Sequence, residues 1–578
     1  MYILHIHDQH FLNYTINQIN RKPGKRQTFG SHPQDAQCIK TERIDSENRF
    51  DIIIAGMKLS KLTKTSLLLF ICYGVSKITA VLRQMIIGRQ FGLSMELDVF
   101  NIANNLPDML FTLISGGALS MALIPVMSDV INKDGKRSGW ILFSSIANLC
   151  FLCAGILAVL TSVFAKPLVV SEIGIAPGFT VEQQSAVVRL MRMNLIAMLI
   201  FALSGMVTGG LQANQHFLLP ALAPIFYNFG QIYGAVVLSP AEPYRLGPVT
   251  LPCRGLGIDG LVWGVIIGAA AHLLIQVPAL IRHDFCWVPG IAFKDDRVRR
   301  VLRVLGPRIL SVFFIQLIFI IRDNYASRLA SGAVTALSYG YMFQQLPETL
   351  IGTAIGTAIL PSLSLFISNE DLPGYRDVID KACRIALALS IGCAVIMSVG
   401  MGPVIGAFFA FDDVQNRLMM HTLYGFLAGL AGHCLLEIAN RAYYAKENAL
   451  VPLLSTVLNV IVYIGAGFVF YRRLGAPGLS LTDSIAFTIQ AVLMLVILAN
   501  TEKFRKLFFG RKMLSVTPNL WGTLLRAVPG AAFAGGICFV LMTFLKINIL
   551  VKSVLGMGTA IVLYFIAIIP ELKLLKKF

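Results

Sequence analysis

GWILFSSIANLCFLCAGILAVLTSVFA, residues 139–165, is the stretch that decides the fold class of this chain. It contains no Asp, Glu, Lys or Arg, and about 20 apolar residues in a helix cross the roughly 30 Å of hydrocarbon in a bilayer. Similar stretches recur to the C-terminus and predict an all-α polytopic membrane protein with about 14 transmembrane helices. The expected spans are about 65–88, 97–127, 139–165, 187–212, 218–239, 258–281, 305–330, 333–366, 383–411, 419–444, 450–473, 478–500, 523–545 and 549–572.

The composition and the placement of charge agree with this class. Of the 578 residues 56% are hydrophobic and 14% are charged, whereas soluble domains average about 25% charged. The formal net charge of +18 does not indicate a nucleic-acid partner, because the Lys and Arg gather in loops that alternating spans place on one side of the membrane. The positive-inside rule then predicts cytoplasmic N- and C-termini, with the basic loops against anionic lipid headgroups.

Residues 1–57 differ from the rest of the chain. They are polar, carry no apolar run long enough to span a membrane, and are expected to form a disordered extension. His5, His7 and His10 allow a metal site there, although a flexible tail is the preferred interpretation. Met57 opens a basic lead into the first span and is a second candidate for the translation start.

An internal repeat divides the spans into two sets of six. Leu106-Pro107-Asp108-Met109-Leu110 in the second span is matched by Leu346-Pro347-Glu348-Thr349-Leu350 in the eighth. Parallel repeats of this kind are a transporter design that places the substrate site between the halves, near the midplane of the bilayer. We therefore expect an N-lobe over 58–300, a C-lobe over 301–505 and two further helices within 506–578. Pro107, Pro347 and Gly74 are the expected hinge residues along the cavity.

Several segments together resemble one known family. The first are Ser76-Lys77, Leu82-Arg83, Gly88-Arg89-Gln90-Phe91-Gly92, Asp98, Leu106-Pro107, Gly117-Ala118-Leu119-Ser120 and Pro125; the later ones include Ala176-Pro177-Gly178-Phe179, Leu305-Gly306-Pro307 and Leu360-Pro361-Ser362-Leu363-Ser364. In combination they resemble the MviN/MurJ family of lipid II flippases over about residues 58–575. The resemblance implies a fold like that of multidrug and polysaccharide exporters. It also implies transfer of a lipid-linked peptidoglycan precursor across the bacterial inner membrane, with the cell-wall synthesis machinery as a further partner.

The resemblance places three substrate-binding candidates in the first two spans. Lys77 stands where the family usually has arginine, Arg83 matches a family arginine, and Asp98 matches a family aspartate. Cations in a membrane cavity suit a pyrophosphate-linked headgroup, although Lys77 and Arg83 can also snorkel or pair internally. We favour the cavity, because charge inside a membrane is costly to retain without a use.

The sequence departs from the family at positions of expected charge. Phe111 and Thr112 replace paired arginines, while Met342 replaces a third arginine, beside Tyr341. Arg322 and Asp323 in the seventh span either substitute for the lost charge in binding substrate or neutralise each other, and the sequence favours neither interpretation.

Coupling and catalysis have weaker signals. Asp323 and Asn459 are candidates for a monovalent cation site, a membrane potential is the other energy source, and no cofactor is expected. Glu437 and Arg441, spaced i to i+4, are predicted to form a structural ion pair. No convergent nucleophile set or phosphate-binding glycine motif indicates an enzyme, and His272, His421 and His433 are expected to be packed and hydrogen-bonded. A flippase for another lipid-linked oligosaccharide and a cation-coupled exporter of small amphiphiles remain alternatives.

Overall fold

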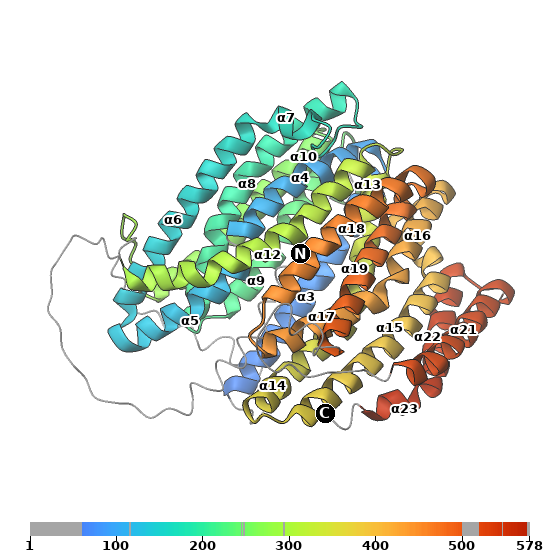
Figure 1. The fold of residues 1–578 in the computed structure, drawn as a ribbon. Helices are drawn as coiled ribbons and strands as arrows, with labels where there is room; N and C mark the ends of the chain where they lie inside the picture. Colours follow the sequence, from blue (N-terminus) through green and yellow to red (C-terminus); the bar gives the residue numbers. More distant parts are fainter. Residues whose placement is uncertain are drawn as a thin grey trace. The chain divides into compact units, whose positions relative to one another are not determined.

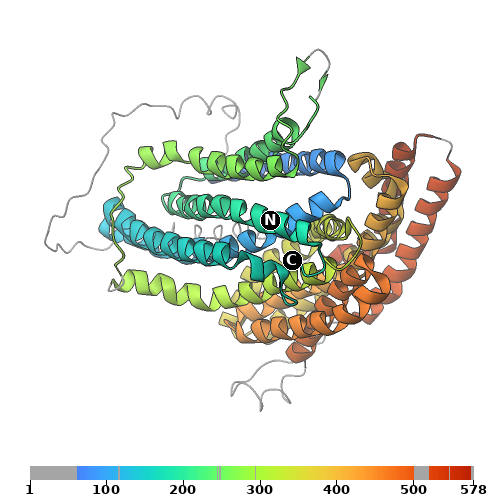
Figure 2. The same ribbon diagram turned by 90° about the horizontal axis from the view of Figure 1, so that it is seen from above.

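The computed structural model describes residues 61–114, 117–243, 245–246, 249–292, 295–499, 520–545 and 547–574. The predicted disordered extension over 1–57 lies outside these residues. Within them the regular secondary structure is helical apart from one two-stranded antiparallel hairpin, β1 (Arg245–Leu246) and β2 (Val249–Thr250). In Figure 2 this hairpin extends beyond the helices that flank it in the sequence.

The helices follow the predicted spans closely. In the first half they are α3 (Lys61–Phe91), α4 (Met95–Ile114), α5 (Gly117–Asp134), α6 (Lys136–Val163), α7 (Ala165–Val170), α8 (Val181–Ala213), α9 (Leu218–Tyr233) with the π-helical turn η1 (Gly234–Leu238), α10 (Ile258–Leu274) and α11 (Val277–Arg282). In the second half they are α12 (Asp296–Ala326), α13 (Ala333–Glu348), η2 (Thr349–Thr353), α14 (Ala354–Ser368), α15 (Leu372–Phe409), α16 (Asp413–Ala428), α17 (Leu430–Ala445), α18 (Leu450–Leu474), α19 (Ala476–Ala499), α21 (Trp521–Phe544), α22 (Ile549–Ala567) and α23 (Ile569–Leu572).

Ten helical segments of the described chain are long and apolar enough to cross a membrane, or up to 11 if the bent pair α16 and α17 is one span. The polytopic all-α class is therefore confirmed, while the count of 14 stays a prediction. The span predicted over 97–127 contains α4, which continues through Pro107, and α5, with residues 115 and 116 outside the described chain. The span predicted over 333–366 is interrupted, because it passes from α13 through η2 to α14.

The interruption in the second of these spans has a local cause. Pro347 has no backbone N–H, so the helical bond from residue 347 to residue 343 is missing, and the π-helical turn η2 begins two residues later. A π-helical turn is one way in which a helix accommodates such a missing bond. The proline of the repeat therefore marks a real irregularity in α13.

The chain divides into two compact units. Unit 1 contains the described residues up to Gln90, with Ala103–Val169 and Val181–Phe313; unit 2 contains Phe91–Ile102, Val170–Thr180 and the described residues from Phe314 onward. The predicted lobe boundaries at residues 300 and 505 stay predictions.

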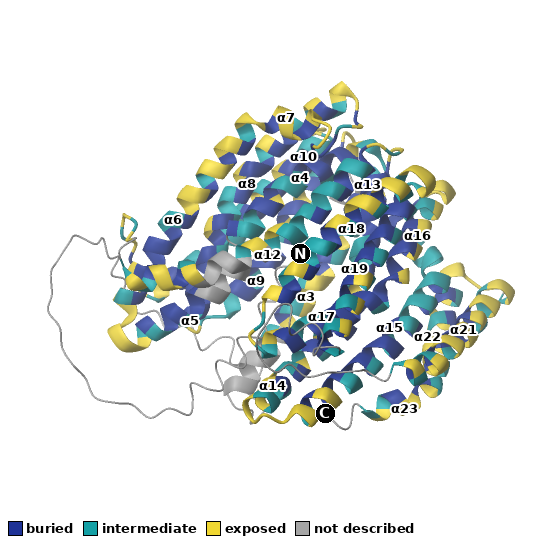
Figure 3. Ribbon diagram, viewed as in Figure 1, coloured by how far each residue is buried: buried dark blue, intermediate teal, exposed yellow. Residues whose placement is uncertain are grey.

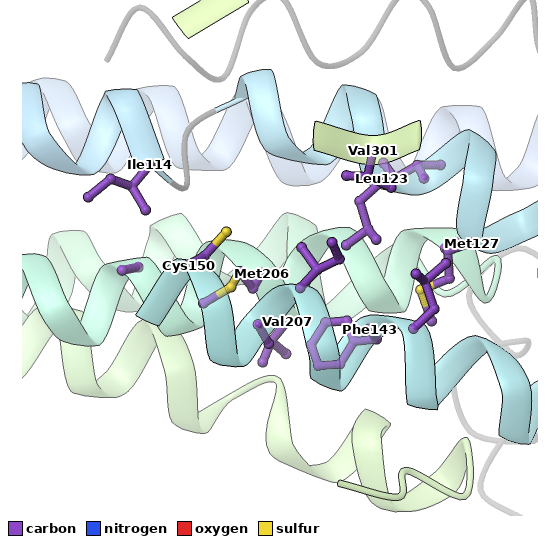
Figure 4. Close-up of a cluster of buried hydrophobic side chains, with 14 of the residues drawn as sticks. Ile114, Leu123, Met127, Phe143, Cys150, Met206, Val207 and Val301 are labelled. Carbon is purple, nitrogen blue, oxygen red and sulfur yellow. The ribbon is translucent and has the colours of Figure 1, made fainter. Parts of the chain in front are cut away.

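Unit 1 is held together by an apolar core and by close helix contacts. In Figure 1, α8 runs beside α6 and α10. Phe143, Cys150, Met206 and Val207 pack in the buried cluster of Figure 4. α9 and α10 meet at glycines: a Cβ added to Gly230 would lie 2.3 Å from the Cα of Gly268. Glycines at a helix contact let membrane helices pack backbone to backbone.

Unit 2 packs α21 and α22 against the long helix α15. The Tyr564 hydroxyl donates to the Ala388 carbonyl at 2.5 Å, and a Cβ on Gly392 would overlap the Tyr564 ring. Exposed residues, yellow in Figure 3, cover the outer faces of α21 and α22. Many of them are large and apolar, including Phe533, Phe539 and Val562, as expected for a surface that faces lipid.

Candidate functional site

Arg83 is fixed inside unit 1. Only 9% of its surface is exposed, and its Nη1 donates to Asn228 Oδ1 at 3.0 Å. The Asn228 amide in turn donates to Thr79 Oγ1 at 2.9 Å, so α9 is tied back to the helix that carries the arginine. The guanidinium also lies 5.7 Å from the ring centroid of Tyr227, within range of a cation–π interaction. Arg83 is thus oriented by packing and hydrogen bonds.

Two further charged residues of unit 1 lie near Arg83: Lys77 is near it in the sequence, and Asp108 is near it in space. Lys77 is exposed, on a different face of α3 from Arg83, as six helical residues of about 100° each predict. Asp108, which follows the proline of the first repeat, is also exposed and interacts electrostatically with Arg83. Asn104 donates to Asp108 Oδ2 at 2.9 Å. Arg83 and Asp108 therefore bring opposite charges from α3 and α4 together.

Asp98 makes the densest set of contacts among the predicted residues. Its side chain is 1% exposed and lies in unit 2 with the start of α13. Oδ2 accepts from the Gly332 N–H at 2.7 Å, while Oδ1 accepts from the Thr335 N–H at 2.7 Å and from Thr335 Oγ1 at 2.6 Å. A carboxylate at a helix N-terminus satisfies otherwise unpaired N–H groups and opposes the helix dipole. Asp98 caps α13 from another helix.

Arg322 and Asp323 contact each other. The Arg322 Nη2 lies 3.4 Å from Asp323 Oδ1, and the two side chains are 8% and 0% exposed. The Arg322 guanidinium also lies 5.0 Å from the ring centroid of Phe319. This geometry favours mutual neutralisation over replacement of the missing cations.

Phe111 and Tyr341, two positions at which the sequence departs from the family pattern, pack against aromatic rings. Phe111 packs 5.5 Å from the ring of Phe201, and the Thr112 hydroxyl donates to the Asp108 carbonyl at 2.7 Å. In unit 2, Tyr341 lies 5.5 Å from Phe319. The side chains at these positions are used in packing and local hydrogen bonds.

The remaining sequence candidates have local roles. α3 is continuous through Gly74, and a Cβ there would meet nothing within 4 Å. The Asn459 amide donates to Gln490 Oε1 at 2.7 Å, an ordinary contact between α18 and α19. The predicted pair of Glu437 and Arg441 is confirmed at 3.2 Å.

Sequence reasoning missed a buried cluster in unit 2. His433 Nε2 lies 3.0 Å from Asp483 Oδ2, and its Nδ1 lies 3.8 Å from Glu348 Oε1. The three residues come from α17, α19 and α13, and Phe487 stacks on the imidazole at 4.2 Å. His433 is packed and hydrogen-bonded, as the sequence predicts, but its two acidic partners were not predicted. The available signal was Glu348, the acid of the second Leu-Pro repeat.

Comparison with known proteins finds similarity over most of the chain. A family model described as "Lipid II flippase MurJ" matches residues 87–558. The lipid II flippase MurJ of Burkholderia cenocepacia is 27% identical over 429 residues, which cover 73% of this chain and 80% of that protein. A probable lipid II flippase MurJ of Buchnera aphidicola is 26% identical over 415 residues, covering 71% and 78%.

Solved structures show the same fold. The structure of a lipid II flippase MurJ in an inward closed conformation aligns with a TM-score of 0.69 and 20% identity, over 88% of this chain and all of that one. An inward-facing multidrug resistance transporter of the MATE family aligns with a TM-score of 0.60 and 14% identity, over 75% and 96%.

Proposed function

Because the chain belongs to the MurJ family of lipid II flippases, we propose that it moves lipid II from the inner to the outer leaflet of the bacterial cytoplasmic membrane. The observation that carries this proposal is the family match over residues 87–558, supported by the fold. The family transports a lipid rather than catalysing a reaction. Multiple apolar helices agree with a multi-pass protein of the inner membrane.

The substrate explains why a buried cation is retained. A polar sugar–peptide headgroup on a pyrophosphate cannot cross hydrocarbon unaided, so the protein must offer it polar and cationic groups. Arg83 is already oriented by Asn228 and Tyr227, so little side-chain entropy is lost when it binds an anion. Lys77 is exposed on the same helix and provides a second cation. We assign the pyrophosphate to Arg83, and Lys77, on another face of α3, to the anionic headgroup as a second cation.

Transport by this mechanism proceeds by alternating access. The contact of Asp98 with the first turn of α13 is a discrete set of hydrogen bonds that a conformational change can break as a unit. Both termini lie in the cytoplasm, and the basic loops contact anionic headgroups. Cell-wall synthesis enzymes are partners that supply or consume the lipid.

A flippase for another lipid-linked oligosaccharide is the second candidate. The observation that favours it is the replacement of three expected arginines by Phe111, Thr112 and Met342, with Phe111 packed on an aromatic ring. Fewer cations give a weaker site for a doubly charged pyrophosphate, which suits a headgroup recognised mainly through its sugars.

Complementation separates these candidates. The chain is expressed in bacteria depleted of their own lipid II flippase, beside a matched Arg83→Ala variant at equal abundance. Growth with the wild-type chain and lysis with the variant support the proposal. Lysis with both, although purified protein moves another polyprenyl-linked glycan in vesicles, supports the second candidate.

A further inference from the structure

The cluster of Glu348, His433 and Asp483 has no part in the mechanism above, yet it is deeply buried. Their exposed fractions are 5%, 1% and 7%. They lie on three helices of unit 2, so a long-range fold brings them together. Ionisable groups inside a membrane protein are expensive to retain and usually mark a functional site.

The charges of this cluster do not balance when both acids are ionised. In the described part of the chain, the salt bridges of Glu348 and Asp483 both go to His433. Two carboxylates and one imidazolium carry a net charge of −1, and one more proton makes the cluster neutral. Burial penalises the charged form strongly, so the cluster has two states that differ by one proton.

The histidine is placed to bridge the two acids. Its Nε2 lies within hydrogen-bond distance of Asp483 Oδ2, at 3.0 Å, whereas its Nδ1 lies 3.8 Å from Glu348 Oε1, which is within ion-pair range but too long for a hydrogen bond. The Phe487 ring lies nearly parallel to the imidazole, at an interplanar angle of 18°, and holds its plane. The imidazolium is therefore shared between Asp483 and the acid that can take up the extra proton, Glu348.

Gln344 also holds the Glu348 side chain in place. It is fully buried, and its Nε2 donates to Glu348 Oε2 at 3.3 Å. A carboxyl oxygen accepts this bond both in the ionised acid and as the carbonyl oxygen of the protonated acid. The contact therefore orients Glu348 in both of its protonation states.

The neighbouring titratable groups do not supply the missing charge. Around the cluster they are Cys434 and Glu437 of α17, Cys393 of α15 and Tyr463 of α18. Arg322 and Asp323 of α12 also interact with Tyr463, and they pair with each other. Glu437 is paired with Arg441 on its own helix. The remaining three are neutral when protonated. The uncompensated charge stays on Glu348, His433 and Asp483.

We propose that Glu348, His433 and Asp483 form a buried proton-binding site that takes up and releases one proton in each transport cycle. The proton joins a carboxylate oxygen of Glu348, while His433 remains protonated beside Asp483. Coupling of this site to lipid movement rests on the proposed flippase function.

The position of Glu348 explains how its charge acts on the fold. It is the last residue of α13 and lies next to the π-helical turn η2. In η2, Gly352 packs so closely on α17 that a Cβ added to it would lie 2.8 Å from the Cα of Cys434. The other end of α13 is capped by Asp98. The 14 residues from Thr335 to Glu348 span about 20 Å, so a single helix, α13, connects the proton site to the cap.

The test uses the full-length protein in vesicles with fluorescent lipid II, whose transfer is read by a membrane-impermeant quencher. At clamped membrane potential, a gradient of one pH unit changes the wild-type rate by up to about tenfold, the limit for one proton. Glu348→Gln and His433→Gln lose this dependence. Asp413→Asn, an exposed carboxylate at the start of α16, keeps it.

The outcomes separate the site from the flippase function. Wild-type transfer that responds to a sodium gradient and not to pH overturns the proton proposal alone. If wild type moves no lipid II, the flippase proposal fails, and pH titration of labelled histidines decides on the site. If the signal of the labelled His433 titrates identically in wild type and in Glu348→Gln, the proton-site proposal is overturned. A shifted His433 titration in the variant supports the proposal. If Glu348→Gln does not fold, Asp483→Asn takes its place as the test variant. A pH-sensitive dye trapped inside the vesicles then measures whether the wild-type protein moves one proton for each lipid.

Discussion

Asp98→Asn tests the coupling between α4 and α13 most directly. The carboxylate accepts three hydrogen bonds from Gly332 and Thr335 at 2.6–2.7 Å, and each bond to a charged group contributes about 1.5–3 kcal/mol. Asparagine keeps one oxygen and turns an NH2 group toward the N–H of Gly332 or Thr335. It also loses the negative charge at the N-terminus of α13.

The expected loss is about 2–4 kcal/mol for the capped state, because at least one bond is lost and the dipole interaction disappears. This corresponds to about 30- to 1,000-fold in the equilibrium between the capped and uncapped states. A transporter can occupy the uncapped state without unfolding. The loss of folding stability therefore cannot exceed the free-energy difference between the capped and the uncapped state. Turnover should therefore fall by more than tenfold while the melting temperature changes little.

The assay measures lipid II transfer in vesicles together with thermal unfolding of the same preparation. Glu96→Gln is the control, because Glu96 lies in the first turn of α4 but is exposed. Thr335→Val removes one of the three bonds and should have an intermediate effect. Wild-type turnover in Asp98→Asn, or a loss of turnover fully matched by unfolding, refutes the assignment of Asp98 as a conformational contact.

Arg83→Ala and Lys77→Ala should each abolish transport at near-normal protein levels, whereas Lys77→Arg should be tolerated; wild-type transport in both alanine variants contradicts the cationic site and favours an exporter of small amphiphiles. Thr112→Arg and Met342→Arg should tighten binding of lipid II in a vesicle binding assay, whereas Phe111→Arg should also lose packing against Phe201; no gain with lipid II points to another glycan. A chain that starts at Met57 should insert and transport like the full chain, and its loss of activity at equal expression disproves a dispensable extension. His216 lies between α8 and α9, and burial, then His283 and Arg282, lower its pKa from 6.5 to about 4. The unfolded chain therefore binds more protons as the pH falls from about 6.5 to about 4, so folding stability declines there, and His216→Gln should flatten this decline in a thermal-unfolding series.

Part of the candidate site followed from local sequence. The i to i+4 spacing of Glu437 and Arg441 is enough to predict their pairing, because helix geometry alone brings such residues together. The Leu-Pro repeat likewise marked the irregularity at Pro347. Nothing local indicated that Arg83 is clamped by Asn228, 145 residues away.

The sequence by itself determined the membrane class, the course of most helices and the family. These properties depend on apolar length, periodicity and motifs, which a chain carries whatever its neighbours are. Only the tertiary structure decided that Asp98 caps α13, that Arg322 and Asp323 contact each other, and that His433 bridges two acids. Asp98 and His433 reach partners that are far away in the sequence. Arg322 and Asp323 are neighbours in the sequence, but only the fold shows that their side chains contact each other. Hydrogen bonds and ion pairs act over a few ångströms in space, and sequence distance does not report that proximity.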